Sequence, residues 1–127
     1  MSRTRALIVV ALIAVFVVAG GVLIYVNGHK GGENVTFDLS VTGARAMKVD
    51  SPSGIDPEKL QAHQNDTITI NLKSDQDGEV HLHDYDIAFA TRAGQTVSKT
   101  FQADKTCTCE IEWESTSTHL GTLTVSP

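Results

Sequence analysis

The sequence predicts an all-β Greek-key sandwich preceded by one N-terminal transmembrane helix. An uninterrupted apolar run spans residues 6–26. After it come short segments in which apolar and polar residues alternate, separated by clusters of Gly, Pro, Asp and Ser. Only one later segment has helical features. Many short strands with almost no helix are typical of an antiparallel sandwich or a Greek-key barrel.

The apolar run is long enough to span a membrane. Its 21 residues carry no charge, and as a helix they would measure about 31 Å, close to the ~30 Å of a bilayer's hydrocarbon core. The apolar core of a signal peptide is shorter and is followed by small residues, whereas this run ends in bulky ones. We therefore expect a signal anchor. Cleavage near Gly20 and Gly21 is the alternative, and it leaves the following domain on the same side of the membrane.

The charges around the run set its expected direction. Arg3 and Arg5 precede it, so the positive-inside rule places residues 1–5 in the cytoplasm. Residues 27–33 are polar and rich in Gly, which indicates a flexible tether. Residues 34–127 then form the domain, which we expect outside the cytoplasm, in the periplasm or at the cell surface.

Six segments are expected to be strands because their apolar residues recur at every second position. In two of them histidines share the phase of the apolar residues, so we expect His81 and His83 in one segment and His119 in the other on buried faces. The helical features are confined to residues 56–63, where Asp56 is a candidate cap and Pro57 takes the first helical position. The expected strands are 34–42, 66–73, 81–89, 96–101, 107–114 and 119–126.

The composition narrows the classes of partner. All fifteen acidic residues but only eight of the ten basic ones follow the apolar run, a net charge of −7. Nucleic acids and anionic lipids bind clusters of Lys and Arg, so we expect no nucleic-acid partner and contact with the membrane only through the N-terminal helix. An acidic surface is compatible with a basic partner protein or with cations. No nucleophile or phosphate-loop motif is present, and we expect no enzyme.

Several short motifs occur in a specific order and spacing. They are Asn65–Ile70, Glu79–Ile87, Ala93-Gly94-Gln95, Thr100–Asp104, Cys109–Glu112 and Leu120–Pro127. In this order they resemble the cupredoxin-like domains, in particular the small membrane-anchored or exported bacterial ones. The resemblance covers residues 34–127 and implies a cupredoxin-like β-sandwich.

The resemblance also implies where copper would bind. Family members that hold copper take one His from a mid-chain strand, and a Cys, a second His and often a Met from the loop between the last two strands. His83 falls at the mid-chain position and His119 where the Met often stands, but Trp113 occupies the Cys position. Blue copper needs that thiolate, and no Cys lies in the loop to build a dinuclear thiolate-bridged centre. We therefore exclude both conventional centres.

Histidines offer another metal site. His81 and His83 are two residues apart on one strand, so both rings can point to the same side, about 6–7 Å apart at the backbone. With His119 brought close by the fold, they would form a three-histidine site suited to Cu(II) or Zn(II). The alternative is a set of partly exposed histidines retained from a copper-binding ancestor.

Cys107 and Cys109 are the only cysteines, and three interpretations stay open. A disulfide between strand positions i and i+2 would span about 6.6 Å between Cα atoms, at the upper edge of the permitted range. A Cys-x-Cys pair could instead bind Cu(I), which prefers thiolates. The third interpretation is that both side chains fill the core.

The sequence thus leads to a membrane-tethered, extracytoplasmic copper-binding protein that handles copper or delivers it to a cuproprotein. The alternative, from a different class, is a metal-free cupredoxin-fold module with an interaction or structural role in the cell envelope. Electron transfer is a weaker alternative.

Overall fold

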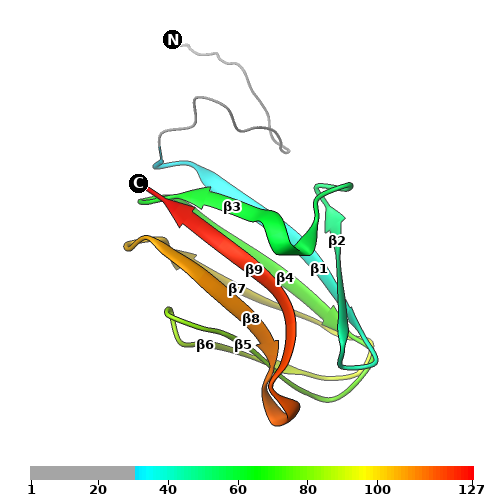
Figure 1. The fold of residues 1–127 in the computed structure, drawn as a ribbon. Helices are drawn as coiled ribbons and strands as arrows, with labels where there is room; N and C mark the ends of the chain where they lie inside the picture. The colour runs from blue at the N-terminus through cyan, green and yellow to red at the C-terminus, as the bar shows by residue number, and fades with distance from the viewer. Residues whose placement is uncertain (1–30) are drawn as a thin grey trace.

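The computed structural model describes residues 31–127, and it is a sandwich of two β-sheets (Figure 1). The expected anchor 6–26 and most of the tether lie outside the described residues. Within the described part, no helix has the length and apolar character needed to cross a membrane. The expected all-β sandwich is confirmed.

One sheet has four strands in the order β2-β1-β4-β7, and the other has five in the order β3-β9-β8-β5-β6. Neighbouring strands are antiparallel except for the parallel pairs β1–β4 and β3–β9. The first sheet contains β1 (Asn34–Thr42), β2 (Ala46–Ser51), β4 (Thr67–Ser74) and β7 (Thr96–Gln102). The second contains β3 (Leu60–His63), β5 (Gly78–Leu82), β6 (Ile87–Thr91), β8 (Cys107–Trp113) and β9 (Thr118–Ser126), with 3₁₀ turns η1 (Pro57–Lys59) and η2 (Glu114–Thr116).

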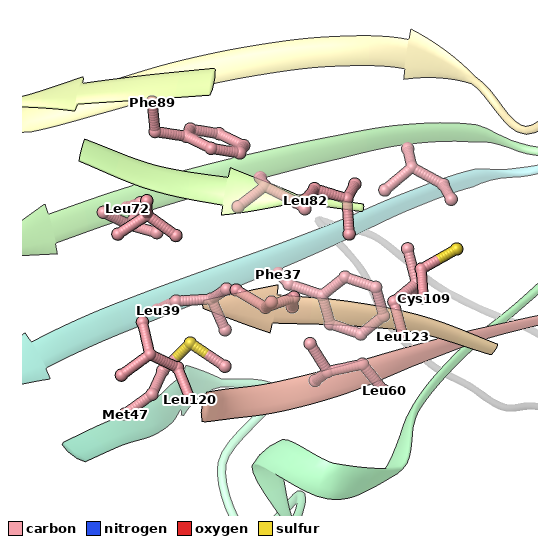
Figure 2. Close-up of a cluster of buried hydrophobic side chains, with 14 of the residues drawn as sticks. Phe37, Leu39, Met47, Leu60, Leu72, Leu82, Phe89, Cys109, Leu120 and Leu123 are labelled. Atoms are coloured by element: carbon pink, nitrogen blue, oxygen red, sulfur yellow. The ribbon is translucent and has the colours of Figure 1, made fainter. Parts of the chain in front are cut away.

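The core lies between the sheets and is built from alternate residues of the strands (Figure 2). In β8 the buried residues are Cys109, Ile111 and Trp113, while Glu110 and Glu112 point away from the core. Trp113, which stands at the family's Cys position, is 4% exposed. The period-two pattern of this strand therefore separates an apolar inner face from an acidic outer face.

The expected single strand 81–89 is wrong. β5 ends at Leu82 and β6 begins at Ile87, with a turn between them. Asp84 and Asp86 in this turn have φ values of 69° and 54°, a left-handed conformation that Asp tolerates better than most residues. Local turn geometry thus outweighs a sequence pattern that continues smoothly through the segment.

The turn also changes where the histidines lie. β5 buries Val80 and Leu82, so His81 belongs to the outer face of the sheet. The expectation that His81 and His83 share a buried face is therefore wrong. Both rings lie on the solvent side of the five-stranded sheet.

A bulge in β9 places His119 on the outer face as well. Ile111 pairs with Gly121, but Glu112, one residue later, pairs with His119, so Leu120 is an extra residue in β9. Leu120 and Gly121 are both buried, and His119 points outward. The expectation that His119 and Gly121 share one face of the strand is wrong, because a bulge between two residues reverses the alternation of side chains across it.

Segment 56–63 is only partly as expected. Asp56 caps the turn by accepting a hydrogen bond from the Glu58 N–H at 2.9 Å, and Pro57 follows it. The helix is a single 3₁₀ turn, however, and the chain then forms β3 alongside β9. β2 and β3 were not expected, because their apolar positions are too few to give a clear period.

We predict that Gly121→Ala destabilises the fold. A Cβ built on Gly121 would lie 2.6 Å from the Met47 Cε and 2.6 Å from the Pro57 carbonyl oxygen. A methionine tip can move but a backbone oxygen cannot easily do so, and we expect a loss of about 1–3 kcal/mol in the free energy of unfolding. Urea denaturation measures it. Thr124→Ala, on the outer side of the same strand, is the control. Equal stability of the two variants would show that η1 does not pack on β9 as described.

Candidate metal centre

Histidines and carboxylates lie side by side on the outer face of the five-stranded sheet. The strand register places Glu112 of β8 opposite His81 of β5 on one side and opposite His119 of β9 on the other. Residues from η1, η2 and the 83–86 turn extend the arrangement. We call it the histidine–carboxylate band; it comprises His81, His83, His119, Glu58, Glu110, Glu112, Glu114 and Asp86.

Within the band, His81, His83 and Glu112 each offer a donor atom, and these atoms all lie within 4.8 Å of one another. The two imidazole centroids are 4.6 Å apart with an interplanar angle of 67°, and the His83 Nε2 lies 2.7 Å from the Glu112 Oε1. The Glu112 side chain is only 12% exposed, and that of His81 19%. The three donors therefore converge at a partly sheltered point.

The backbone explains why His83 joins this group although β5 has ended. Its N–H donates to the Glu110 carbonyl at 2.9 Å, so the β5–β8 ladder continues for one more residue. Residues i and i+2 of a strand point to the same side, and His83 consequently stays on the face of His81. The chain turns away only at Asp84.

Two imidazoles and one carboxylate suit Cu(II) or Zn(II). Metal–donor bonds of about 2 Å in a tetrahedral set would place the donors about 3.3 Å apart, so small side-chain rotations would be needed. The ring nitrogen that binds the metal must carry no proton. The hydrogen bond to Glu112 raises the pKa of His83, so a proton competes with a metal ion for this ring.

Further carboxylates surround these donors. The His81 Nε2 lies 2.9 Å from Asp86 Oδ1, and its Nδ1 lies 3.6 Å from Glu114 Oε1. Carboxylates that contact the second ring nitrogen of a metal-binding histidine orient the ring and raise its basicity. Either Asp86 or Glu114 would orient the His81 ring in this way while the other ring nitrogen binds the metal.

His119 lies beside this group but is held differently. Its Nδ1 is 2.8 Å from a Glu110 oxygen, and its Nε2 is 2.8 Å from both oxygens of Glu58. Ionised carboxylates only accept hydrogen bonds, so both ring nitrogens donate and the ring is an imidazolium. The contact with Glu58, followed by that with Glu110, raises the pKa of His119.

The structure therefore does not gather the three histidines around one point. One carboxylate oxygen of Glu110 lies 3.9 Å from the His83 Nε2, and the other oxygen of the same carboxylate contacts the His119 Nδ1. The two rings are separated by a single carboxylate, and His119 offers no lone pair in this arrangement. Its role as a ligand stays a prediction, whereas Glu112 takes the third place in the group that the structure assembles.

Sequence reasoning missed the carboxylates of the site. A His-x-His motif in one strand and a Glu-x-Glu motif in another were a usable signal, because the side chains of the two motifs lie next to one another when the strands pair. Glu58 gave no such signal. It binds His119 and the Thr122 hydroxyl, at 2.8 Å each, only because η1 packs on a strand some sixty residues later.

The positions carried over from the family are not assembled at a common pole. Trp113 pairs with Val80 and is buried between the sheets. His83 lies across from Glu110 on the outer face. The mid-chain His position and the Cys position thus lie on opposite sides of the same sheet.

Cys107 and Cys109 are joined by a disulfide, with Cα atoms 5.4 Å apart. Cys109 is completely buried and Cys107 is half-buried. The carboxylate of Asp84 lies within 4.8 Å of both sulfurs. Disulfide sulfurs are not thiolates, so binding of Cu(I) to this pair would first require reduction.

Comparison with known proteins gives structural matches only; no family model and no curated protein matches the sequence. Similar solved structures include a blue copper oxidase from Nitrosomonas europaea, with a TM-score of 0.48 and 18% identity over 75% of this chain and 39% of that one. They also include a copper nitrite reductase from the same organism, with a TM-score of 0.46 and 16% identity over 74% and 41%. A copper-containing nitrite reductase from Thermus scotoductus has a TM-score of 0.45 and 15% identity over 75% and 28%.

The chain thus spans about two fifths or less of the length of these proteins. The order of its motifs resembles that of the cupredoxin-like domains, and the arrangement of its two sheets agrees with the β-sandwich that this resemblance implies.

We predict that the Glu58–His119 contact makes stability depend on pH. It raises the pKa of His119 above its ordinary 6.5 and lowers that of Glu58 below 4.5. The stabilisation is therefore fully present between these ordinary values, and it is lost as the pH rises through the raised pKa of His119 or falls through the lowered pKa of Glu58. Both side chains are about half exposed, so screening limits the effect to below about 1 kcal/mol.

Urea denaturation at about pH 5.5 and about pH 9 measures this difference. Glu58→Gln should reduce the loss of stability at the higher pH, because the neutral amide cannot hold the proton on His119. Glu79→Gln, on β5, is the matched control and should behave like the wild type. An unchanged pH dependence in Glu58→Gln would contradict the assignment of His119 as an imidazolium.

Proposed function

We propose that this chain is a copper-binding protein that lies outside the cytoplasm, is held to the membrane by residues 6–26 and handles or delivers copper. Cu(II) would bind to His81, His83 and Glu112. The single observation that carries the proposal is the convergence of their donor atoms within 4.8 Å on the outer face of the sheet.

The donor set supports copper over other common cations. Calcium and magnesium prefer sites built entirely from oxygen, whereas this group contains two imidazoles. Among divalent first-row ions, nitrogen and oxygen sites bind Cu(II) most strongly. Zn(II) is the next candidate. The relative availability of Cu(II) and Zn(II) outside the cytoplasm would decide which of the two ions binds.

The exposure of the site supports handling or delivery. His83 is 38% exposed, and the group lies on a sheet face, so a bound ion would be accessible to a second protein. The acidic surface would favour a basic partner or a cuproprotein with a basic docking face. No thiolate belongs to this group, which weighs against rapid electron transfer, and the absence of a catalytic motif in the sequence supports a binding role.

We predict that the full chain, purified in detergent, binds one Cu(II) ion without the intense absorption of a thiolate–Cu(II) bond. His81→Ala and His83→Ala should each weaken binding by at least about tenfold to a hundredfold, because each removes one of three donors. Glu112→Gln should weaken it as well. Titration against a chromophoric chelator measures the affinity and the stoichiometry.

His119→Ala is the discriminating variant. It should change the affinity less than His83→Ala does, because His119 is engaged by two carboxylates and lies outside the donor group. If His119→Ala lowers the Cu(II) affinity as much as His83→Ala does, the three-histidine site is supported instead. Failure of the wild type to bind Cu(II) more tightly than about micromolar would refute the copper proposal.

A metal-free interaction or structural module is the second candidate. The observation that favours it is that every histidine of the band already contacts a carboxylate, so the band can serve as an ion-pair network on its own. The same titration decides, because such a module would give no specific Cu(II) binding while its fold stayed intact.

We predict that the domain stays associated with the membrane of intact spheroplasts. When protease is added to these spheroplasts, it should degrade the domain. The physical reason is the span of residues 6–26 with Arg3 and Arg5 on its cytoplasmic side. Immunoblotting of membrane and soluble fractions measures this. Release of a shortened domain into the soluble fraction would favour cleavage near Gly20 and Gly21, and protection from protease would contradict the proposed topology.

A further inference from the structure

A second group of donors lies on the other side of the sheet from the histidine–carboxylate band. It consists of Cys107, Cys109 and Asp84, whose sulfur and carboxylate atoms all lie within 4.8 Å of one another. The two cysteines occupy inward positions of β8, and Cys109 belongs to the hydrophobic core (Figure 2). The group shares no side chain with the proposed copper site.

Asp84 is held over the cysteines by its turn. Its backbone adopts the left-handed conformation, with φ of 69°, and its carboxylate lies within 4.8 Å of both sulfurs. The neighbouring Tyr85 hydroxyl donates to the Lys105 carbonyl, and the Lys105 N–H donates to the Tyr85 oxygen at 3.3 Å. These contacts tie the turn to the segment that leads directly into Cys107.

In the structure the two sulfurs are bonded to each other, so only Asp84 can act as a donor to a cation. We propose that reduction of this disulfide opens a binding site for a thiophilic divalent cation of the Zn(II) class, made by the two thiolates and the Asp84 carboxylate. The site is separate from the proposed Cu(II) site and does not depend on it.

The chemistry requires two equivalents of an external thiol as reductant. The first thiolate attacks the sulfur of Cys107, which is the more exposed of the two, and the disulfide bond breaks with its electron pair on Cys109. A second thiolate attacks the external sulfur of the mixed disulfide and releases Cys107. The external thiols leave as their disulfide, and binding of the cation then displaces the two thiol protons.

The charge of the donor set selects the cation. Two thiolates and a carboxylate carry three negative charges at the edge of an apolar core, where uncompensated charge is costly. A divalent ion leaves one negative charge and Cu(I) leaves two. Zn(II) also accepts both sulfur and carboxylate oxygen as ligands, whereas Cu(I) favours sulfur. The three donors together therefore fit Zn(II) better than they fit Cu(I).

The test compares the full chain in detergent before and after reduction with a phosphine that is then removed under anaerobic conditions. Cd(II) is the spectroscopic probe, because its bonds to thiolates absorb in the ultraviolet. Zn(II) affinity is measured by competition with a chromophoric chelator. We expect one equivalent of Cd(II) with thiolate absorption in the reduced chain and none in the oxidised chain. Because the comparison uses the unmutated protein, it does not depend on whether a cysteine variant folds.

Asp84→Asn should lower the Zn(II) affinity of the reduced chain by at least about tenfold, since Asn tolerates the left-handed conformation but is a poor metal ligand. Asp104→Asn removes an equal charge from the neighbouring loop and should bind like the wild type. His81→Ala should weaken Cu(II) binding and leave this site intact, so the two proposals can fail separately. Absence of thiolate absorption after reduction, or equal affinities for Asp84→Asn and Asp104→Asn, would overturn the inference.

Discussion

The position of β8 between β5 and β9 is the constraint on which the rest of the domain depends. Its inward residues complete the core, and the side chains of its outward residues, Glu110 and Glu112, contact histidines of the neighbouring segments. Because successive side chains of a strand alternate, burial of Ile111 and Trp113 fixes the direction of both glutamates. Hydrophobic packing inside the sandwich thereby sets the geometry of the polar site outside it.

Two irregularities bring the histidines to that outer face. β5 ends at Leu82, and the left-handed residues Asp84 and Asp86 turn the chain away directly after His83. The extra residue Leu120 in β9 reverses the alternation at His119. Neither is required for a two-sheet sandwich. Bulges and left-handed turn residues are frequent next to functional sites, where they redirect side chains, and here both act on histidines.

The outer face concentrates carboxylates that would repel one another without cations between them. His119 supplies one such charge when it is protonated, and its contacts with Glu58 and Glu110 favour that state because they raise its pKa. The His81–His83–Glu112 group can gain positive charge either from a proton or from a metal ion. A binding site and an ion-pair network are thus two uses of the same electrostatic arrangement, and they differ in whether a metal displaces the proton.

The sequence by itself determined the sandwich and most of its strands, because the alternation in segments such as 34–42 and 107–114 requires one buried face. It also determined that Trp113 cannot supply a thiolate and that two histidines share one side of a strand. Only the tertiary structure decided which side that is, and which carboxylates meet the rings. The turn at Asp84, the bulge at Leu120 and the packing of η1 near His119 depend on contacts between distant segments, and a local period of two residues contains no information about them.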